Sequence, residues 1–297
     1  MGDARTTLLA AIAPAIWGST YYVTTEFLPD GYPLTVAMLR ALPAGLLLLL
    51  LVRRLPRLPE VPRVATLGAL NFSIFWALLF VAAYRLPGGV AATVGAVQPL
   101  VVIFLSRLAI GAPIRALSII AALAGLAGVA LLVLTPAAAL DPIGVLAGLG
   151  GAVSMSAGTV FSRKWRPADA SHLTFTAWQL TAGGLLLAPF ALWFEPELPA
   201  VTSEAVIGIA YLGLIGAALT YVLWFRGVAR LDPAALSALG FLSPVSALLL
   251  GWLLLGQELT ELQLAGFVIV PGGVWLGQSA PRAARSAPNS ALQPANP

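Results

Sequence analysis

One arginine, Arg40, stands inside a long apolar run of the sequence, where it could bind an anionic group. Arg40 lies about seven residues into this run, so in a membrane-spanning helix it would lie ~10 Å below the membrane surface. A charge at that depth costs several kcal/mol unless it is paired or hydrated, so a functional role is the first interpretation. In one reading the guanidinium binds a substrate carboxylate. In the other, its long stem reaches toward the surface and the guanidinium ties helix ends together. Both readings of Arg40 are open from the sequence.

The other polar and aromatic residues of the apolar runs could line a substrate cavity. Trp17 and Tyr21 stand one helical turn apart, on one face of the first run. An apolar cavity with a few amide and hydroxyl groups suits a small amphipathic solute such as an amino acid. Ordinary helix packing, or an interfacial position of the tryptophans, is the alternative. We expect Trp17 and Trp224 to form apolar walls, and the other lining residues to be Asn71, Phe75, Trp76, Gln98, Ser156, Thr159, Trp178, Gln179, Tyr221 and Ser243.

The apolar runs lack the residues that enzymatic or metal chemistry needs. The chain has no cysteine, and its single histidine, His172, lies in a basic loop. A membrane-embedded transferase would need His, Asp, Cys or a Ser–base pair within the runs. We therefore predict no catalytic residue, no metal and no cofactor. Glu26 and Glu258 lie only at the ends of runs, and proton-driven pumps place a carboxylate or histidine within the membrane, so we expect facilitated diffusion or exchange.

The composition requires a lipid environment. Of the 297 residues, 59% are apolar and 9% are charged, whereas about 25% of a soluble domain is charged. The net charge is +4, but the basic residues occupy short loops between apolar runs. This placement indicates membrane topology rather than a nucleic-acid partner. We predict that the partners are bilayer lipids and a small-molecule substrate.

Ten apolar segments are each long enough to cross a membrane, because roughly 20 apolar residues span ~30 Å of hydrocarbon as a helix. The alternative for the first segment is a signal peptide. If the N-terminus is cytoplasmic, nearly all Lys and Arg residues fall on the inside, which predicts that both termini are cytoplasmic. The predicted spans are residues 7–25, 33–52, 64–84, 87–108, 116–135, 142–162, 173–194, 205–225, 233–255 and 262–279.

The sequence repeats internally. Residues 34–40 (LTVAMLR) resemble residues 173–179 (LTFTAWQ), so that Arg40 corresponds to Gln179. A second set is displaced by one common interval: Arg85, Gly95, Pro99 and Gly111 recur as Arg230, Gly240, Pro244 and Gly256. We predict an all-α protein with five-helix repeats at 1–135 and 136–280 and a disordered cytoplasmic tail at 281–297. An odd number of spans per repeat inverts the second repeat, which is an architecture for alternating access.

Prolines and small residues mark further features of the repeats. We interpret Pro99 and Pro244 as matched bends, or hinges, near the transport path, with simple packing kinks as the alternative. Small residues let helices approach closely. Such small-residue faces are more often contacts between helices of the scaffold than substrate ligands. A homodimer interface through these faces is the alternative. The small faces of the fifth and tenth spans comprise Ala121, Gly125, Gly128, Gly273 and Gly277.

Four stretches resemble a known family. They are residues 16–19 (IWGS), Leu39 with Arg40, residues 99–111 and residues 244–259. Over residues 7–280 the chain resembles the EamA-type members of the drug/metabolite transporter superfamily, which implies ten helices and transport. Family members usually have Glu after the last glycine of the third and fourth stretches, where Ala112 and Gln257 stand here, with Glu258 one place on. Among relatives, the resemblance most suggests bacterial amino-acid and aromatic-metabolite exporters.

We therefore predict a secondary transporter in a bacterial inner membrane that exports small amphipathic metabolites, most plausibly amino acids. A central cavity between the repeats would bind the substrate. The alternatives are a transporter of another cargo such as cationic drugs, a membrane-embedded transferase, and an assembly protein.

Overall fold

The computed structural model describes residues 2–29, 31–86, 88–133, 141–196, 202–256 and 258–286, and these form helices without any strand. The first part of the chain forms α1 (Gly2–Trp17), α2 (Ser19–Phe27), α3 (Pro33–Val52), η1 (Leu58–Glu60), α4 (Val61–Gly68), η2 (Ala69–Ser73), α5 (Ile74–Arg85), α6 (Gly88–Gly95), α7 (Gln98–Ile110) and α8 (Ala116–Val133). The second part forms α9 (Pro142–Trp165), α10 (His172–Phe194), α11 (Ser203–Gly213), η3 (Leu214–Leu219), α12 (Thr220–Arg230), α13 (Pro233–Ala238), η4 (Leu239–Phe241), α14 (Leu242–Leu255) and α15 (Glu261–Ser286).

The all-helical membrane class predicted from the composition is confirmed. In the described part of the chain, eight helical segments are long and apolar enough to cross a membrane. α1 and α2 are not among them, because a turn at Gly18 divides the first predicted span into two shorter helices. α15 is not among them either. The eight segments are Pro33–Val52, Leu58–Leu79, Ala92–Ile110, Ala116–Val133, Pro142–Trp165, His172–Phe194, Ser203–Arg230 and Pro233–Leu255.

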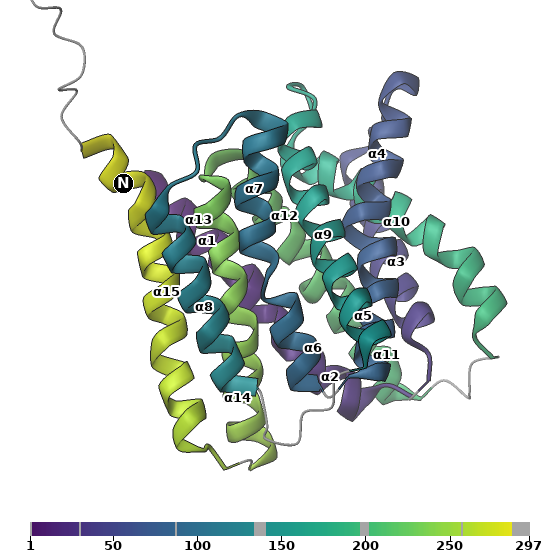
Figure 1. The fold of residues 1–297 in the computed structure, drawn as a ribbon. Helices are drawn as coiled ribbons and strands as arrows, with labels where there is room; N and C mark the ends of the chain where they lie inside the picture. Colours follow the sequence, from purple (N-terminus) through teal and green to yellow (C-terminus); the bar gives the residue numbers. More distant parts are fainter. Residues whose placement is uncertain are drawn as a thin grey trace, which may run out of the picture.

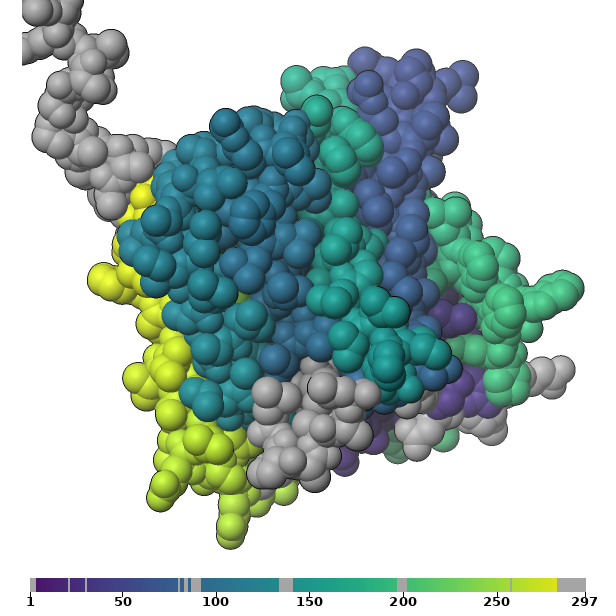
Figure 2. Space-filling view, viewed as in Figure 1, coloured from purple at the N-terminus to yellow at the C-terminus, as the bar shows by residue number. Residues whose placement is uncertain are grey.

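Large apolar side chains cover the outside of the helical bundle. Leu108 on α7 is 83% exposed, and Phe104, Ile120 and Leu123 are also exposed. Figure 2 shows the face to which α7, α8 and α9 contribute, with α15 along one edge. Water would not solvate such a surface, whereas lipid chains would, so these side chains mark the surface that faces the bilayer.

Five helix pairs make the most extensive contacts in the bundle: α3 with α10, α8 with α15, α5 with α9, α1 with α12, and α7 with α9. In Figure 1, α8 and α15 run side by side, and the start of α1 lies at the same face of the molecule as the described end of α15. α15 continues to Ser286, further than predicted, because Ala and Arg favour a helix up to the residues before Pro288. Residues 287–297 of the predicted disordered tail lie outside the described part.

Glycines at the contacts between paired helices let the helices approach closely. A Cβ atom on Gly184 of α10 would lie 2.6 Å from Cβ of Leu42 on α3, and no such contact is tolerated. On α15, a Cβ atom on Gly266 would lie 2.7 Å from the carbonyl oxygen of Gly128 on α8. The predicted small faces of α8 and α15 thus pack on each other within the chain, and a homodimer through them stays a prediction.

Four of the predicted spans are interrupted at matching places. The segments η2 and η3 are π-helical and interrupt the helices α4–α5 and α11–α12. Two residues separate the end of α6 from the start of α7, and the short 3₁₀-helix η4 separates α13 from α14. Pro99 is in the first turn of α7 and Pro244 is in the first turn of α14, so both follow directly after these interruptions, and their role as hinges stays a prediction. A proline is tolerated there because the first helical N–H groups have no intrahelical partner.

Candidate substrate site

Aromatic rings from the first, third and eighth predicted spans meet in the main core of the protein. The ring of Trp17, at the end of α1, lies 5.1 Å from that of Tyr221 and 5.2 Å from that of Trp224, both on α12. Tyr221 in turn lies 4.7 Å from Phe72 on η2, and Phe72 lies 5.4 Å from Trp76 on α5. We call these five residues the aromatic cluster. They join segments that are far apart in the sequence, as an inter-helical substrate site requires.

A buried hydroxyl group fixes the orientation of Trp17. The indole Nε1 of Trp17 donates to Oγ1 of Thr220 over 3.0 Å. The Thr220 hydroxyl donates to the carbonyl oxygen of Gly216, one turn earlier, over 2.9 Å. Within the described residues, the indole Nε1 of the buried Trp224 has no partner. An unpaired buried donor costs free energy, so it marks a place where a polar ligand group could bind.

Arg40 is buried beside the aromatic cluster. Its Nη2 donates to the carbonyl oxygen of Gly216 over 2.8 Å, and its guanidinium carbon lies 5.2 Å from the ring centre of Trp76. No carboxylate pairs with Arg40 among the described residues, and its Nε has no partner there. The cation is therefore held by a carbonyl dipole and a π-face, both weaker counter-charges than a carboxylate.

Two predicted lining residues bind each other. Nδ2 of Asn71, on η2, donates to Oε1 of Gln179, on α10, over 2.8 Å, and to Oγ of Ser162 over 3.2 Å. Asn71 packs closely against Gly158 of α9, where any Cβ atom would collide with its side-chain amide. The side chains of Asn71 and Gln179 are both fully buried. This amide pair ties η2 to α9 and α10.

The remaining predicted site residues are distributed around this region. Ser156 is buried, and its hydroxyl donates to backbone carbonyls of Ala152 and Gln98 over 2.6 and 3.3 Å. Thr159 is buried beside a cavity of about 10 Å³ that is also lined by Arg163 and Leu236. The remaining three are placed as follows: Phe75 packs against the main core, Ser243 approaches Gly18 through its backbone, and the side chain of Tyr21 lies outside the described part.

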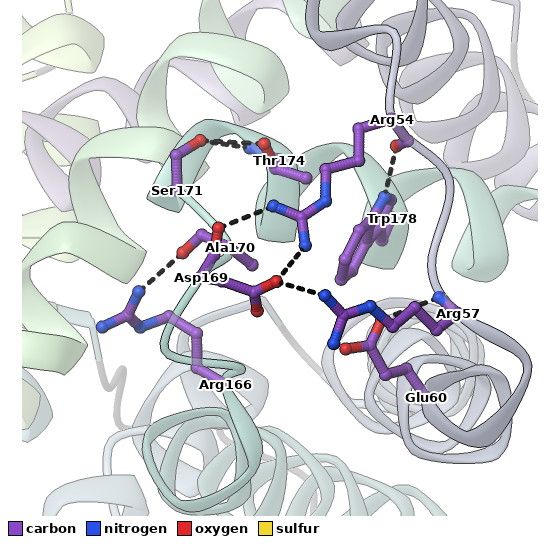
Figure 3. Close-up of polar contacts among 9 residues, drawn as sticks. All are labelled: Arg54, Arg57, Glu60, Arg166, Asp169, Ala170, Ser171, Thr174 and Trp178. Atoms are coloured by element: carbon purple, nitrogen blue, oxygen red, sulfur yellow. Dashed lines mark hydrogen bonds and ion pairs between the residues drawn. The ribbon is translucent and has the colours of Figure 1, made fainter.

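Trp178 lies in a separate cluster at one end of the bundle. Its Nε1 donates to the backbone carbonyl of Arg54 over 2.7 Å, and the Arg54 guanidinium lies over its ring (Figure 3). Arg54 and Arg57, which follow α3, both bind the Asp169 carboxylate, at 2.5 and 2.9 Å. The hydrogen bond from Arg54 and the charges of both arginines lower the pKa of the Asp169 carboxyl below its ordinary value of 3.8. This arrangement clamps the end of α3 to the loop before α10.

Several structural residues of the site were not predicted from the sequence. Phe72 was overlooked because an apolar ring in an apolar run carries no signal. Thr220 and Gly216 were overlooked because their role depends on neighbouring helices. Glu195, at the end of α10, accepts hydrogen bonds from the backbone N–H groups of Leu34 and Thr35 at the start of α3, over 2.5 and 2.7 Å. A carboxylate satisfies helix N-termini in this way.

The sequence profile of the EamA-like transporter family matches residues 4–134 and again residues 142–277. The chain belongs to the EamA-like transporter family. This EamA-like transporter is therefore a multi-pass membrane protein that transports a small molecule, and not an enzyme. The family is part of the drug/metabolite transporter superfamily, as its sequence motifs indicated.

Curated relatives and a solved structure agree with this assignment. Protein PecM of Dickeya dadantii (strain 3937) is 47% identical over 262 residues, which is 88% of each chain. The uncharacterized inner membrane transporter YedA of Escherichia coli (strain K12) is 32% identical over 263 residues, 86% of this chain and 85% of that one. A crystal structure with 23% sequence identity superposes with a TM-score of 0.82, covering 95% of this chain and 99% of the other, and shows that the fold is shared.

Proposed function

We propose that this EamA-like transporter exports small amphipathic metabolites, amino acids above all, by alternating access between two inverted five-helix halves. The observation that carries the proposal is the aromatic cluster. Its rings come from α1, η2, α5 and α12, and a buried cation, Arg40, lies against it. Apolar rings beside a few polar groups suit a solute with an apolar side chain and charged or polar ends.

Three observations support two equivalent halves. The family profile matches two successive segments of similar length. The π-helical segments η2 and η3 are separated by the interval that relates Arg85 to Arg230 in the repeat. The described chain ends lie at one face, which requires an even number of crossings (Figure 1). Counting α1 with α2 as one span and α15 as another adds two crossings to the eight, which makes ten.

Within the aromatic cluster, Trp17 and Trp224 form the apolar walls of the proposed site. Tyr21, Asn71, Ser156 and Tyr221 supply hydrogen bonds to the amino and carboxylate groups. In the described conformation, the rings of Trp17 and Tyr221 pack directly against each other. A substrate enters between them only when α1 and α12 separate, and such opening and closing is what alternating access requires. The contact of Arg40 with Gly216 favours the reading in which Arg40 ties helices together.

The distribution of charge supports a bacterial inner-membrane location with both termini in the cytoplasm. The face that holds the chain ends also carries the loop after α3 and the loop before α10, with Arg54, Arg57 and Arg166 (Figures 1 and 3). Basic loops remain on the cytoplasmic side of a membrane. YedA is named an inner membrane transporter, which agrees with this location.

A flux screen in liposomes tests the proposal. The purified protein should carry apolar and aromatic amino acids down their own gradients. An imposed pH gradient should change the flux little, because Glu26 and Glu258 lie at the ends of the apolar runs and not at the centre of a span. Strict dependence on a proton gradient would overturn uncoupled transport and point to Glu26 or Glu258. If the protein carries cationic drugs but no amino acids, the proposed substrate class is wrong, and cationic drugs are the substrates.

A further inference from the structure

Two buried polar contacts connect helices of opposite halves. Arg40 on α3 donates from Nη2 to the carbonyl oxygen of Gly216 on η3, over 2.8 Å. Asn71 on η2 donates from Nδ2 to Oε1 of Gln179 on α10, also over 2.8 Å. In each case the helix that forms the second span of one half contacts the π-helical segment in the third span of the other half.

The internal repeat relates all four positions. Residues 34–40 align with residues 173–179, so Arg40 corresponds to Gln179. The interval that takes Arg85 to Arg230 and Pro99 to Pro244 also takes Asn71 to Gly216. The first contact is therefore the second one seen from the opposite half, with a guanidinium and a backbone carbonyl in place of two side-chain amides.

We propose that the two contacts are copies of one inter-half latch, and that Arg40 and Gln179 are positioning residues that hold η3 and η2 during the transport cycle. This inference rests on the proposed function, because it requires two halves that move against each other. It goes beyond that function by assigning the moving segments and the side chains that restrain them.

The π-helical segments are suited to be the restrained parts. A π-segment interrupts the regular bonding of an α-helix, and such segments occur frequently at functional sites. When a π-segment shifts by one residue, the side chains it passes turn by about 100° around the helix axis, since an α-helix has 3.6 residues per turn. Such a shift beyond η3 would reorient Tyr221 and Trp224, and one beyond η2 would reorient Trp76. Each latch therefore controls rings of the aromatic cluster.

A chain of hydrogen bonds connects the first latch to the proposed site. The carbonyl oxygen of Gly216 accepts from Arg40 and also from the hydroxyl of Thr220, which accepts from the indole of Trp17. The first latch is charged and the second is neutral, and charged hydrogen bonds are about twice as strong.

Exchanging the latches between halves tests the inference. Arg40→Gln removes the first latch, and Arg40→Gln combined with Gly216→Asn rebuilds it as the amide pair of the other half. Gly216 has room for a Cβ atom, which would lie 3.6 Å from Nη2 of Arg40 and 3.8 Å from Cδ2 of Leu212, and Arg40→Gln shortens the side chain that faces it. Asn71→Leu removes the second latch and is the matched control.

Hydrogen exchange of the backbone amides and liposome flux give the two readouts. Arg40→Gln should speed exchange in residues 214–219 at least about tenfold, a change of about 1.4 kcal/mol, and leave residues 69–73 unchanged. Asn71→Leu should give the reverse pattern. Arg40→Gln should lower the maximal flux about tenfold with KM little changed, and adding Gly216→Asn should restore both exchange protection and flux to within about threefold of the wild type.

Specific results would overturn the latch. Equal acceleration of exchange in both π-segments by Arg40→Gln would show general destabilisation. Recovery of protection without recovery of flux in the double variant would show that the charge of Arg40 serves the substrate. If Arg40→Gln does not fold, the opposite exchange, Asn71→Gly with Gln179→Arg, should preserve protection of residues 69–73, and its failure in folded protein contradicts the equivalence. Wild-type protein that moves no solute would sink the proposed function, while the exchange pattern would still decide the latch.

Discussion

Replacing Trp17 by alanine should impair both folding and transport, because Trp17 joins α1 to α12. The indole ring contacts the rings of Tyr221 and Trp224, and each aromatic pair contributes ~0.5–1.5 kcal/mol beyond burial. Its hydrogen bond to Thr220 adds about 1 kcal/mol. Burial of the side chain itself contributes ~1.5–3 kcal/mol. Together these terms amount to about 3.5–7 kcal/mol, and because Trp17 is only partly buried we expect a loss of stability near the lower end, about 3–5 kcal/mol.

Transport should fall in a substrate-dependent manner. If Trp17 forms a wall for the apolar side chain of the substrate, its loss removes ~1.5–3 kcal/mol of binding, or about one to two orders of magnitude in apparent affinity. Large apolar amino acids should be affected most, and small polar ones least. Trp17→Phe keeps one aromatic ring but loses the N–H donor and the second ring of the indole, so it should cost less stability than Trp17→Ala and retain more of the flux.

The measurement is initial flux into liposomes, together with thermal unfolding of the same preparations. Trp193→Ala is the matched control, because this tryptophan on α10 is 84% exposed and should leave flux unchanged. Alanine variants of Trp17 and Trp224 that both fold and both transport large apolar amino acids at the wild-type rate would refute the aromatic cluster as the substrate site.

Three further predictions concern packing, pH and topology. Gly184→Ala should destabilise the protein by ~1–3 kcal/mol, since its methyl group would lie 2.6 Å from Cβ of Leu42. Gly272 has open space around it, so Gly272→Ala is the control and should be neutral or stabilising in thermal unfolding. Equal effects of the two substitutions would contradict the close packing of α3 on α10. Because the folded-state pKa of Asp169 is lowered, its ion pairs with Arg54 and Arg57 stabilise the protein above pH 3.8, and this stabilisation is lost as the pH falls through the lower folded-state pKa. Asp169→Asn should therefore lower the unfolding temperature at neutral pH, and the difference from the wild type should disappear in acid. A difference that persists in acid would exclude this cause. Single cysteines should label alternately from the cytoplasm, the periplasm, the cytoplasm and the periplasm when placed at Leu58, Ala138, Ala168 and Ala200, and periplasmic labelling at Ala168 would exclude the inverted arrangement.

The membrane class and the transporter family could be predicted from the sequence because both depend on local pattern. Apolar runs of about 20 residues separated by basic loops have few alternatives to membrane-spanning helices. The repeat was visible because residues such as Pro99 and Pro244 recur at one interval. The same repeat indicated the interruptions of the helices next to these prolines, and whether the prolines act as hinges stays a prediction.

The partners of the site residues could not be predicted. Trp17 and Trp224, which were expected to form the walls of a cavity, lie against each other, whereas Trp178 belongs to the clamp at the end of α3 and Asn71 binds Gln179. The carbonyl of Gly216 that holds Arg40 lies in a segment whose side chains are all apolar.

The sequence by itself determined that this chain crosses a membrane many times, that it repeats internally and that it carries one deeply placed arginine. Only the tertiary structure decided which side chains meet, and that η2 and η3 are π-helical. The physical reason is that lipid and protein interior are both apolar, so the hydrophobic pattern of a spanning helix does not distinguish its buried face from its lipid face. Whether Arg40 meets a carboxylate, a carbonyl or a ring depends on how neighbouring helices pack, and that information lies in contacts between distant residues.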